Sequence, residues 1–189
     1  MIPSYGWLAN TFAPAEQEGI SFDPNLPTRR QEYALFADVV RSLRPEIALD
    51  LGTGYIPTWH VAPYIAAALG TEVHCVDMDP RTLTMPLHRS IIRECMSFLD
   101  ETWVPPLLYY PLVYSISVFE HLPGEGHSRI ARRLSEWLEP GGIFFLTVDG
   151  VDPAILAFLY SEWFDCGERS PDPDAHLQPA VSFLIGRRR

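Results

Sequence analysis

The segment Ile47–Gly54 constrains this chain most, because an apolar run there ends in an acidic residue followed by Gly-x-Gly. Such a segment is typical of a parallel strand that turns tightly into a helix, so that the backbone can approach a nucleotide-like ligand. Glycine is needed at Gly52 and Gly54 because a Cβ would obstruct both the turn and the approach. One such turn is weak evidence for a ligand site, so its interpretation depends on the later segments of the chain.

Three further landmarks follow the turn in an order that suits alternating strands and helices. Asp77 closes a second strand-like run, residues 115–122 close a third, and Pro140–Gly142 lies before a fourth. Residues 164–185 then contain a terminal pair of strands. The pattern predicts an α/β fold: a Rossmann-like three-layer sandwich with a mostly parallel sheet and an antiparallel C-terminal strand.

Hydrophobic periodicity gives the expected boundaries of the elements. Glu32 suits the positive end of the first helix, and Pro63 should kink the second helix or displace its start. Both a helix and a strand fit residues 87–100, where 94–99 is the best strand candidate. We expect one domain over 1–189, with an irregular N-terminal arm at 1–28 and a Rossmann-like core at 29–189. The other expected elements are helices 29–43, 58–69, 128–138 and 153–160, a short helix from Pro80, and strands 47–51, 72–77, 112–118, 143–148, 164–168 and 181–185.

Composition excludes several classes of function. A net charge of −10 on 189 residues disfavours binding to nucleic acid. The three cysteines show no CxxC spacing and the histidines show no metal spacing, so we expect no metal site and a reduced compartment. No apolar run is long enough to span a membrane, and the N-terminus lacks the pattern of a signal peptide. We therefore expect a cytoplasmic protein without membrane contact.

The landmarks together resemble class I S-adenosylmethionine-dependent methyltransferases, and especially the subgroup that includes quinone-biosynthesis C-methyltransferases. Specific motifs cover about residues 30–150. Asp50, Gly52 and Gly54 match the first motif of the family, although Ile56 stands where that motif has its third glycine. The triplet Glu120-His121-Leu122 and the Pro-Gly-Gly segment are the most discriminating matches.

The resemblance implies S-adenosylmethionine as cofactor and methyl transfer to a small-molecule acceptor, with the oligomeric state left open. Asp77 would hold the ribose hydroxyls, Met78 would lie against the adenine, and Asp100 would accept from the adenine amine. Backbone amides near Thr53 suit the cofactor carboxylate. The implied cofactor-binding set is Asp50, Gly52, Thr53, Gly54, Asp77, Met78, Asp100 and Ser117, and His121 is the candidate acid or base.

Other readings of the same residues stay open at this point. Asp50 could cap the glycine turn, and His121 could form a structural hydrogen bond at a strand end. The missing glycine at Ile56 allows a protein of the same fold that binds the cofactor without catalysis. A nicotinamide-dependent oxidoreductase shares the Gly-x-Gly turn and the ribose acid, but the Glu-His-Leu and Pro-Gly-Gly segments and the absence of a Tyr-x-x-x-Lys pair count against it.

Overall fold

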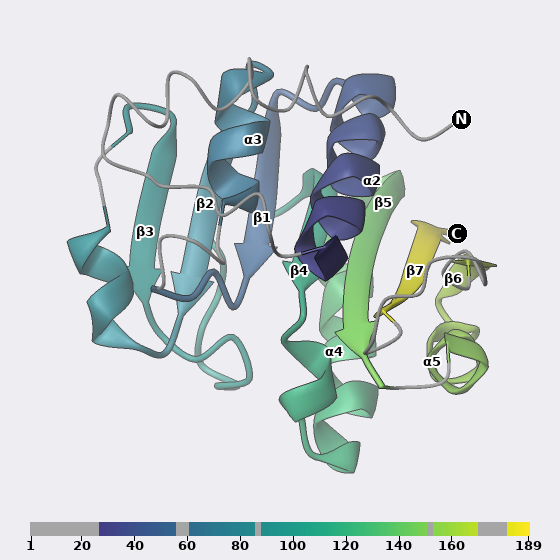
Figure 1. The fold of residues 1–189 in the computed structure, drawn as a ribbon. Helices are drawn as coiled ribbons and strands as arrows, with labels where there is room; N and C mark the ends of the chain where they lie inside the picture. The colour runs from purple at the N-terminus through teal and green to yellow at the C-terminus, as the bar shows by residue number, and fades with distance from the viewer. Residues whose placement is uncertain (1–26, 56–60, 86–87, 151–152, 170–180) are drawn as a thin grey trace.

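The computed structural model describes residues 27–55, 61–85, 88–150, 153–169 and 181–189. Within these residues a single sheet contains seven strands in the order β3-β2-β1-β4-β5-β7-β6 (Figure 1). The elements are α2 (Pro27–Leu43), β1 (Ile47–Leu51), α3 (Ala62–Ala68), β2 (Glu72–Asp77), the 3₁₀ helix η1 (Pro80–Thr84), β3 (Ile91–Cys95), β4 (Tyr110–Ile116), the 3₁₀ helix η2 (Phe119–His121), α4 (Gly124–Trp137), β5 (Leu138–Asp149), α5 (Pro153–Tyr160), β6 (Phe164–Arg169) and β7 (Val181–Arg188).

The sheet is parallel except at its C-terminal strand. β1 pairs with β2 and β4, β2 pairs with β3, and β4 pairs with β5, all in parallel. β7 is antiparallel to both β5 and β6. The strand order reverses between β1 and β4, so the carboxyl ends of these two strands form the topological switch point at which such folds bind ligands.

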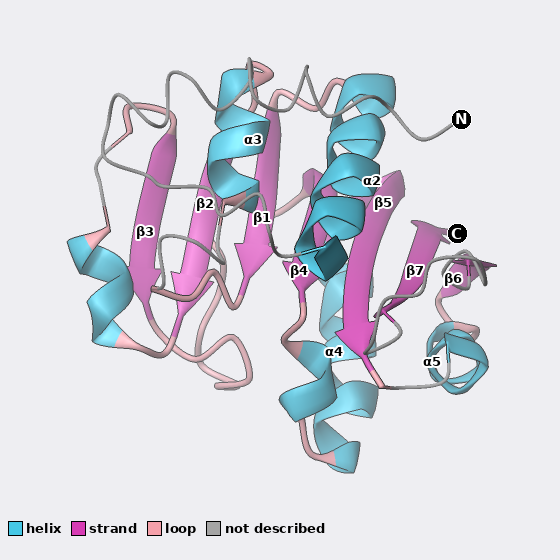
Figure 2. Ribbon diagram, in the orientation of Figure 1, coloured by secondary structure: helices cyan, strands magenta, loops and turns pink. Residues whose placement is uncertain are grey.

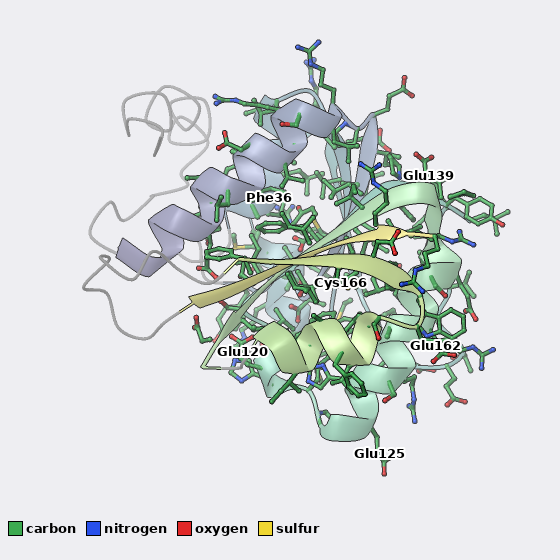
Figure 3. The ribbon with its side chains drawn as sticks, turned by 90° about the vertical axis from the view of Figure 1, so that its right-hand side faces the viewer. Phe36, Glu120, Glu125, Glu139, Glu162 and Cys166 are labelled. Atoms are coloured by element: carbon green, nitrogen blue, oxygen red, sulfur yellow. The ribbon has the colours of Figure 1, made fainter. Side chains whose placement is uncertain are left out.

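Helices cover both faces of the sheet (Figure 2). One core cluster joins α2 and α3 to one face, and a second joins α4 and α5 to the other. On α2 the buried side chains recur at helical spacing, and Phe36 packs against Tyr114 with ring centroids 4.3 Å apart (Figure 3). The predicted Rossmann-like three-layer sandwich with an antiparallel C-terminal strand is therefore confirmed.

Several predicted boundaries were wrong for identifiable reasons. α3 begins at Ala62, with Pro63 in its first turn, so the proline displaces the helix start as expected. The third strand is Ile91–Cys95, not 94–99, and Ile91 pairs with Val73. This strand lies at the sheet edge, where its half-exposed side chains give no clean alternation.

The Pro-Gly-Gly segment lies inside β5 instead of before it. β5 begins at Leu138, directly after α4, and the register with β4 shifts between Tyr110 and Leu112. Gly141 has a φ of +79°, which a residue with a side chain rarely adopts. The segment is thus an irregular beginning of the strand, and the helix before it starts at Gly124, earlier than expected.

Parts of the predicted N-terminal arm and of the first motif fall outside the described residues. Residues 1–26 of the predicted arm and residues 56–60, which include Ile56, are not described, and residues 27–28 belong to α2. No helix in the described ranges is long and apolar enough to cross a membrane. Among the same residues, no group of three or more His, Cys, Asp or Glu side chains is placed to hold a metal ion.

Candidate functional site

The glycine turn after β1 is pressed against the end of β4. Gly52 has a φ of +78°, and its N–H donates to the carbonyl of Val76 on the neighbouring strand at 2.8 Å. A Cβ at Gly52 would lie 2.7 Å from both γ-methyl groups of Val118. Gly54 also has a positive φ, of +71°. Glycine is therefore required here for both backbone conformation and space.

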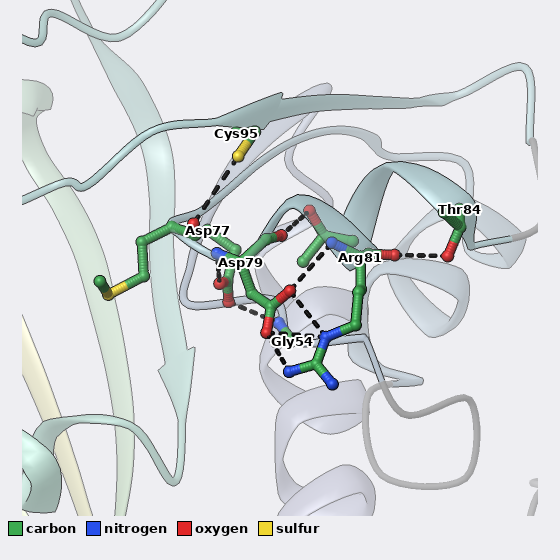
Figure 4. A network of polar contacts seen from close by, with 8 residues as sticks. Gly54, Asp77, Asp79, Arg81, Thr84 and Cys95 are labelled. Atoms are coloured by element: carbon green, nitrogen blue, oxygen red, sulfur yellow. Dashed lines mark hydrogen bonds and ion pairs between the residues drawn. The ribbon is translucent and has the colours of Figure 1, made fainter.

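Asp77 fixes the turn to the end of β2 (Figure 4). Its Oδ2 accepts from the Gly54 N–H at 2.7 Å, and its Oδ1 accepts from the Asp79 N–H at 2.8 Å. A carboxylate has about four acceptor positions, so these two bonds orient the group and leave capacity for a ligand diol. Met78, the next residue, is 75% exposed and presents an apolar surface beside the carboxylate.

Arg81 lies at the same edge of the sheet and contacts both Asp79 and Tyr55 (Figure 4). Its guanidinium donates to both carboxylate oxygens of Asp79, which holds the pKa of that carboxyl below its usual value. The same guanidinium stacks 3.5 Å from the ring centroid of Tyr55. The loop after β1 and the 3₁₀ helix after β2 are thus joined through one arginine side chain.

Asp50 is a buried carboxyl at the end of β1. It is 3% exposed, and its Oδ2 has no hydrogen-bond partner among the described residues. Burial raises its pKa to about 7, with Thr53 lowering the pKa and the charge of Asp77 raising it further. The Asp50 side chain lines a small cavity with Tyr33, Thr53 and the glycine turn. A cation in that cavity would satisfy the orphaned oxygen.

A second buried carboxylate joins α2 to the ends of β4 and β5. Glu32 is fully buried, and its Oε1 accepts from the Ser117 hydroxyl at 2.8 Å and from the Thr147 hydroxyl. Ser117 has a φ of +50°, unusual for a residue with a side chain, and its N–H donates to the Thr147 carbonyl at 2.9 Å. This arrangement fixes the backbone directly after β4.

Further acidic groups lie at the same end of the sheet. Burial raises the pKa of Glu120, and the charge of Asp149 raises it further. Within the described ranges, neither Glu120 Oε2 nor Asp149 Oδ1 has a hydrogen-bond partner. Figure 3 shows Glu120 at the opposite end of the sheet from Glu139. His121 ends η2 and is exposed.

Most residues of the predicted site come together at one edge of the sheet. Seven of them lie at or directly after the carboxyl ends of β1, β2 and β4: Asp50, Gly52, Thr53, Gly54, Asp77, Met78 and Ser117. Asp100 does not directly follow a strand, because β3 ends at Cys95, and its exposed carboxylate accepts from the Thr102 N–H and hydroxyl. The roles of these residues and of His121 in binding or catalysis stay predictions.

Sequence reasoning missed the arrangement around Glu32. We expected this residue to act on the helix dipole, but it shares a helix face with Phe36 and Val40, at i, i+4 and i+8. A carboxylate on an otherwise apolar buried stripe was the available signal, since such a group needs partners. Thr147 gave a similar signal as a polar residue within an apolar strand.

Solved structures resemble this fold at low sequence identity, whereas no protein-family model and no curated protein matches the sequence. The N-methyltransferase NodS from Bradyrhizobium japonicum WM9 aligns with a TM-score of 0.71 at 13% identity, over 88% of this chain and 99% of that one. A Burkholderia thailandensis 1,6-didemethyltoxoflavin-N1-methyltransferase, with 1,6-didemethyltoxoflavin and S-adenosylhomocysteine bound, aligns with a TM-score of 0.67 at 16% identity, over 100% and 90%.

A third structure, precorrin-6y C5,15-methyltransferase from Geobacter metallireducens GS-15, aligns with a TM-score of 0.62 at 12% identity, over 91% of this chain and 96% of that one. These three methyltransferases therefore share the architecture described above along most of their length. The comparison does not confirm the quinone-biosynthesis subgroup, which stays a prediction. The comparison shows that this chain has the class I methyltransferase fold.

Proposed function

We propose that the protein binds S-adenosylmethionine at the carboxyl ends of β1, β2 and β4 and transfers its methyl group to a small-molecule acceptor. The observation that carries the proposal is the bond between the Gly54 N–H and Asp77, which places a carboxylate beside a glycine turn at the switch point. The bound S-adenosylhomocysteine in the Burkholderia enzyme supports the choice of cofactor.

The residues at this edge fit the chemical groups of such a cofactor. Asp77 has acceptor capacity for two vicinal ribose hydroxyls, and exposed Met78 offers an apolar surface for a base. The orphaned Oδ2 of Asp50 suits an ammonium group, since a buried carboxylate gains most from a cation. Asp100, exposed and already bonded to Thr102, is the least supported member of the predicted set.

The cofactor supplies a sulfonium-bound methyl group that is already activated for transfer. The protein then has to hold that group in position, place the acceptor in line with it and exclude water. Gly52 permits the close approach of the loop to Val118, and the hydroxyl of Ser117 is anchored on Glu32. His121 is exposed and lies outside this anchored set, so we expect it to contribute less to turnover than the buried groups.

Calorimetric titration with S-adenosylhomocysteine, with NAD as control, tests the proposal. We expect one-to-one micromolar binding of S-adenosylhomocysteine and none of NAD. Asp77→Ala should weaken binding at least about tenfold, because it removes two acceptor oxygens from the ribose site. Asp165→Ala, which changes an exposed carboxylate on β6, should leave the affinity unchanged. If folded wild-type protein fails to bind the ligand, the proposal is wrong.

A methyl acceptor is sought only after binding is established. The protein loaded with methyl-labelled cofactor is incubated with small molecules, and transfer of label is measured. Binding without transfer to any acceptor would favour a non-catalytic protein of the same fold. A cytoplasmic location and the resemblance to quinone C-methyltransferases are not needed for this proposal.

A further inference from the structure

A cavity of about 640 Å³ lies at the amino ends of the strands, at the opposite end of the sheet from the glycine turn. Its volume falls within the range of small-molecule sites, roughly 300–1,000 Å³. The cavity is formed where the start of β4, the last turns of α4, the start of β6 and the end of β7 meet. The lining residues are Tyr109, Arg132, Ser135, Glu136, Trp163 and Arg188. None of them belongs to the proposed cofactor site.

Strand pairing and one arginine side chain hold these segments together. Tyr110 pairs with Leu138, which sets the start of β4 beside the end of α4. Phe164 pairs with Arg188, which sets the start of β6 beside the end of β7. The Arg188 guanidinium donates to the Leu138 carbonyl and lies 5.9 Å from the ring centroid of Tyr109. A cation is therefore fixed beside an aromatic ring in the wall of the cavity.

Two aromatic side chains in the lining are accessible to solvent. Tyr109 is 55% exposed, and Trp163 is partly exposed. The Trp163 carbonyl accepts from the Arg189 N–H at 3.4 Å, which ties the backbone before β6 to the end of the chain. Aromatic rings offer flat apolar faces on which a planar ligand can pack.

The charged side chains make the lining positive. Arg132 and Glu136 form an i,i+4 ion pair on α4, with Nε and Oε1 3.1 Å apart and side chains that are 72% and 53% exposed. A guanidinium has five N–H donors, so the bond of Arg132 to Glu136 and that of Arg188 to Leu138 leave donors for an anion. Two arginines and one glutamate thus give this cavity a positive charge in a chain whose net charge is −10.

We propose that this cavity binds a small aromatic anion, whose carboxylate or phosphate group contacts Arg132 and Arg188 and whose ring packs on Tyr109 and Trp163. Guanidinium groups bind both kinds of anion through paired N–H donors. The acidic remainder of the chain repels such a ligand, so the positive lining also favours this cavity over other surfaces. The site is independent of the proposed methyl transfer.

The probe is 2-naphthoate, and its binding is followed by NMR of the tryptophan indole N–H groups in ¹⁵N-labelled full-length protein. The chain has five tryptophans, and Trp163→Phe assigns the resonance of Trp163. We expect 2-naphthoate to shift this resonance with a dissociation constant of about 1 mM, as is usual for a ligand of its size. The uncharged 2-naphthalenemethanol and the non-aromatic cyclohexanecarboxylate should each bind at least about threefold more weakly.

A parallel titration with 2-naphthyl phosphate distinguishes the two anionic groups. Tighter binding than 2-naphthoate would identify a phosphate-bearing ligand, and weaker binding would identify a carboxylate. Either result is compatible with the proposal, provided that the Trp163 resonance shifts.

Arg132→Gln tests the role of charge with a matched control on the same helix. Arg129 also lies on α4, is exposed and pairs with a glutamate, Glu101, but it does not line the cavity. Arg132→Gln should weaken 2-naphthoate about three- to fivefold, and Arg129→Gln should not change its affinity. Glu136→Gln should strengthen binding about twofold, because it removes the carboxylate that competes with the ligand for Arg132.

Three results would overturn the proposal. The first is a Trp163 resonance that neither aromatic anion shifts at several millimolar. The second is equal binding of 2-naphthoate and 2-naphthalenemethanol, which would show that charge is not recognised. The third is an equal effect of Arg132→Gln and Arg129→Gln, which would show that the cavity does not provide the binding site.

Discussion

Replacement of Asp50 by asparagine should make the protein more stable above neutral pH while it weakens the cofactor site. Burial raises the pKa of Asp50 from 3.8 to about 7, so the folded state binds a proton that the unfolded state has already released. Stability due to this group is therefore lost as pH rises from about 4 through about 7. Above that range Asp50 is ionised in the folded state as well, and its burial lowers the free energy of unfolding by its full amount, at most about 4 kcal/mol.

The expected size follows from these two pKa values. At pH 5 the Asp50 carboxyl is ionised in the unfolded state and protonated in the folded state. This difference lowers the free energy of unfolding by about 1.6 kcal/mol relative to a side chain that does not titrate. At pH 8 the cost has reached its full value. The stability of Asp50→Asn relative to the wild type should therefore increase by about 3 kcal/mol between pH 5 and pH 8.

Urea denaturation followed by circular dichroism at pH 5, 6, 7 and 8 measures this difference. Asp165→Asn, at an exposed position, is the control and should show no such trend. Asp50→Asn should also lose S-adenosylhomocysteine affinity at pH 8, because the ammonium group of the ligand would no longer meet a carboxylate. A stability difference that stays constant with pH would refute the claim that burial controls the ionisation of Asp50.

Three further substitutions test the packing of the fold. Gly52→Ala should destabilise the protein by about 1–3 kcal/mol in urea denaturation, because its Cβ meets Val118 at 2.7 Å and its φ is positive. Gly186→Ala should cost at least as much, since its Cβ would lie 2.0 Å from the Phe144 ring; a neutral result would show that β5 and β7 pack less closely. Arg133→Ala removes three bonds to carbonyls of the loop after β3, and we expect faster proteolysis of that loop with a stability loss of about 1–3 kcal/mol.

The architecture was predictable where local sterics and burial demand particular residues. Gly52 could be placed because a tight turn after a buried strand requires glycine, and Asp77 could be placed because it matches the acid that ends the second strand in the family that the sequence resembles. Residues 143–148 of β5 were recognisable as a strand because both faces of the sheet are covered there, which makes this part of the sequence almost wholly apolar. These features depend on residues that are close in sequence.

Other features depend on contacts that the sequence does not display. β3 could not be bounded because an edge strand lacks a regular buried face. The role of Glu32 depends on hydroxyls 85 and 115 residues away, on two different strands. His121 matched a motif, yet its exposure is set by the short 3₁₀ helix η2, which the motif does not specify.

A crystal structure of the protein with S-adenosylhomocysteine tests the central claim most directly. We predict the ribose hydroxyls on Asp77, the ammonium group at Asp50 and the sulfur atom facing the end of β4. Adenosine bound at another edge of the sheet, such as the surface between Tyr109 and Trp163 at the amino ends of the strands, would contradict the account. So would a complex at the glycine turn in which the ribose hydroxyls avoid Asp77.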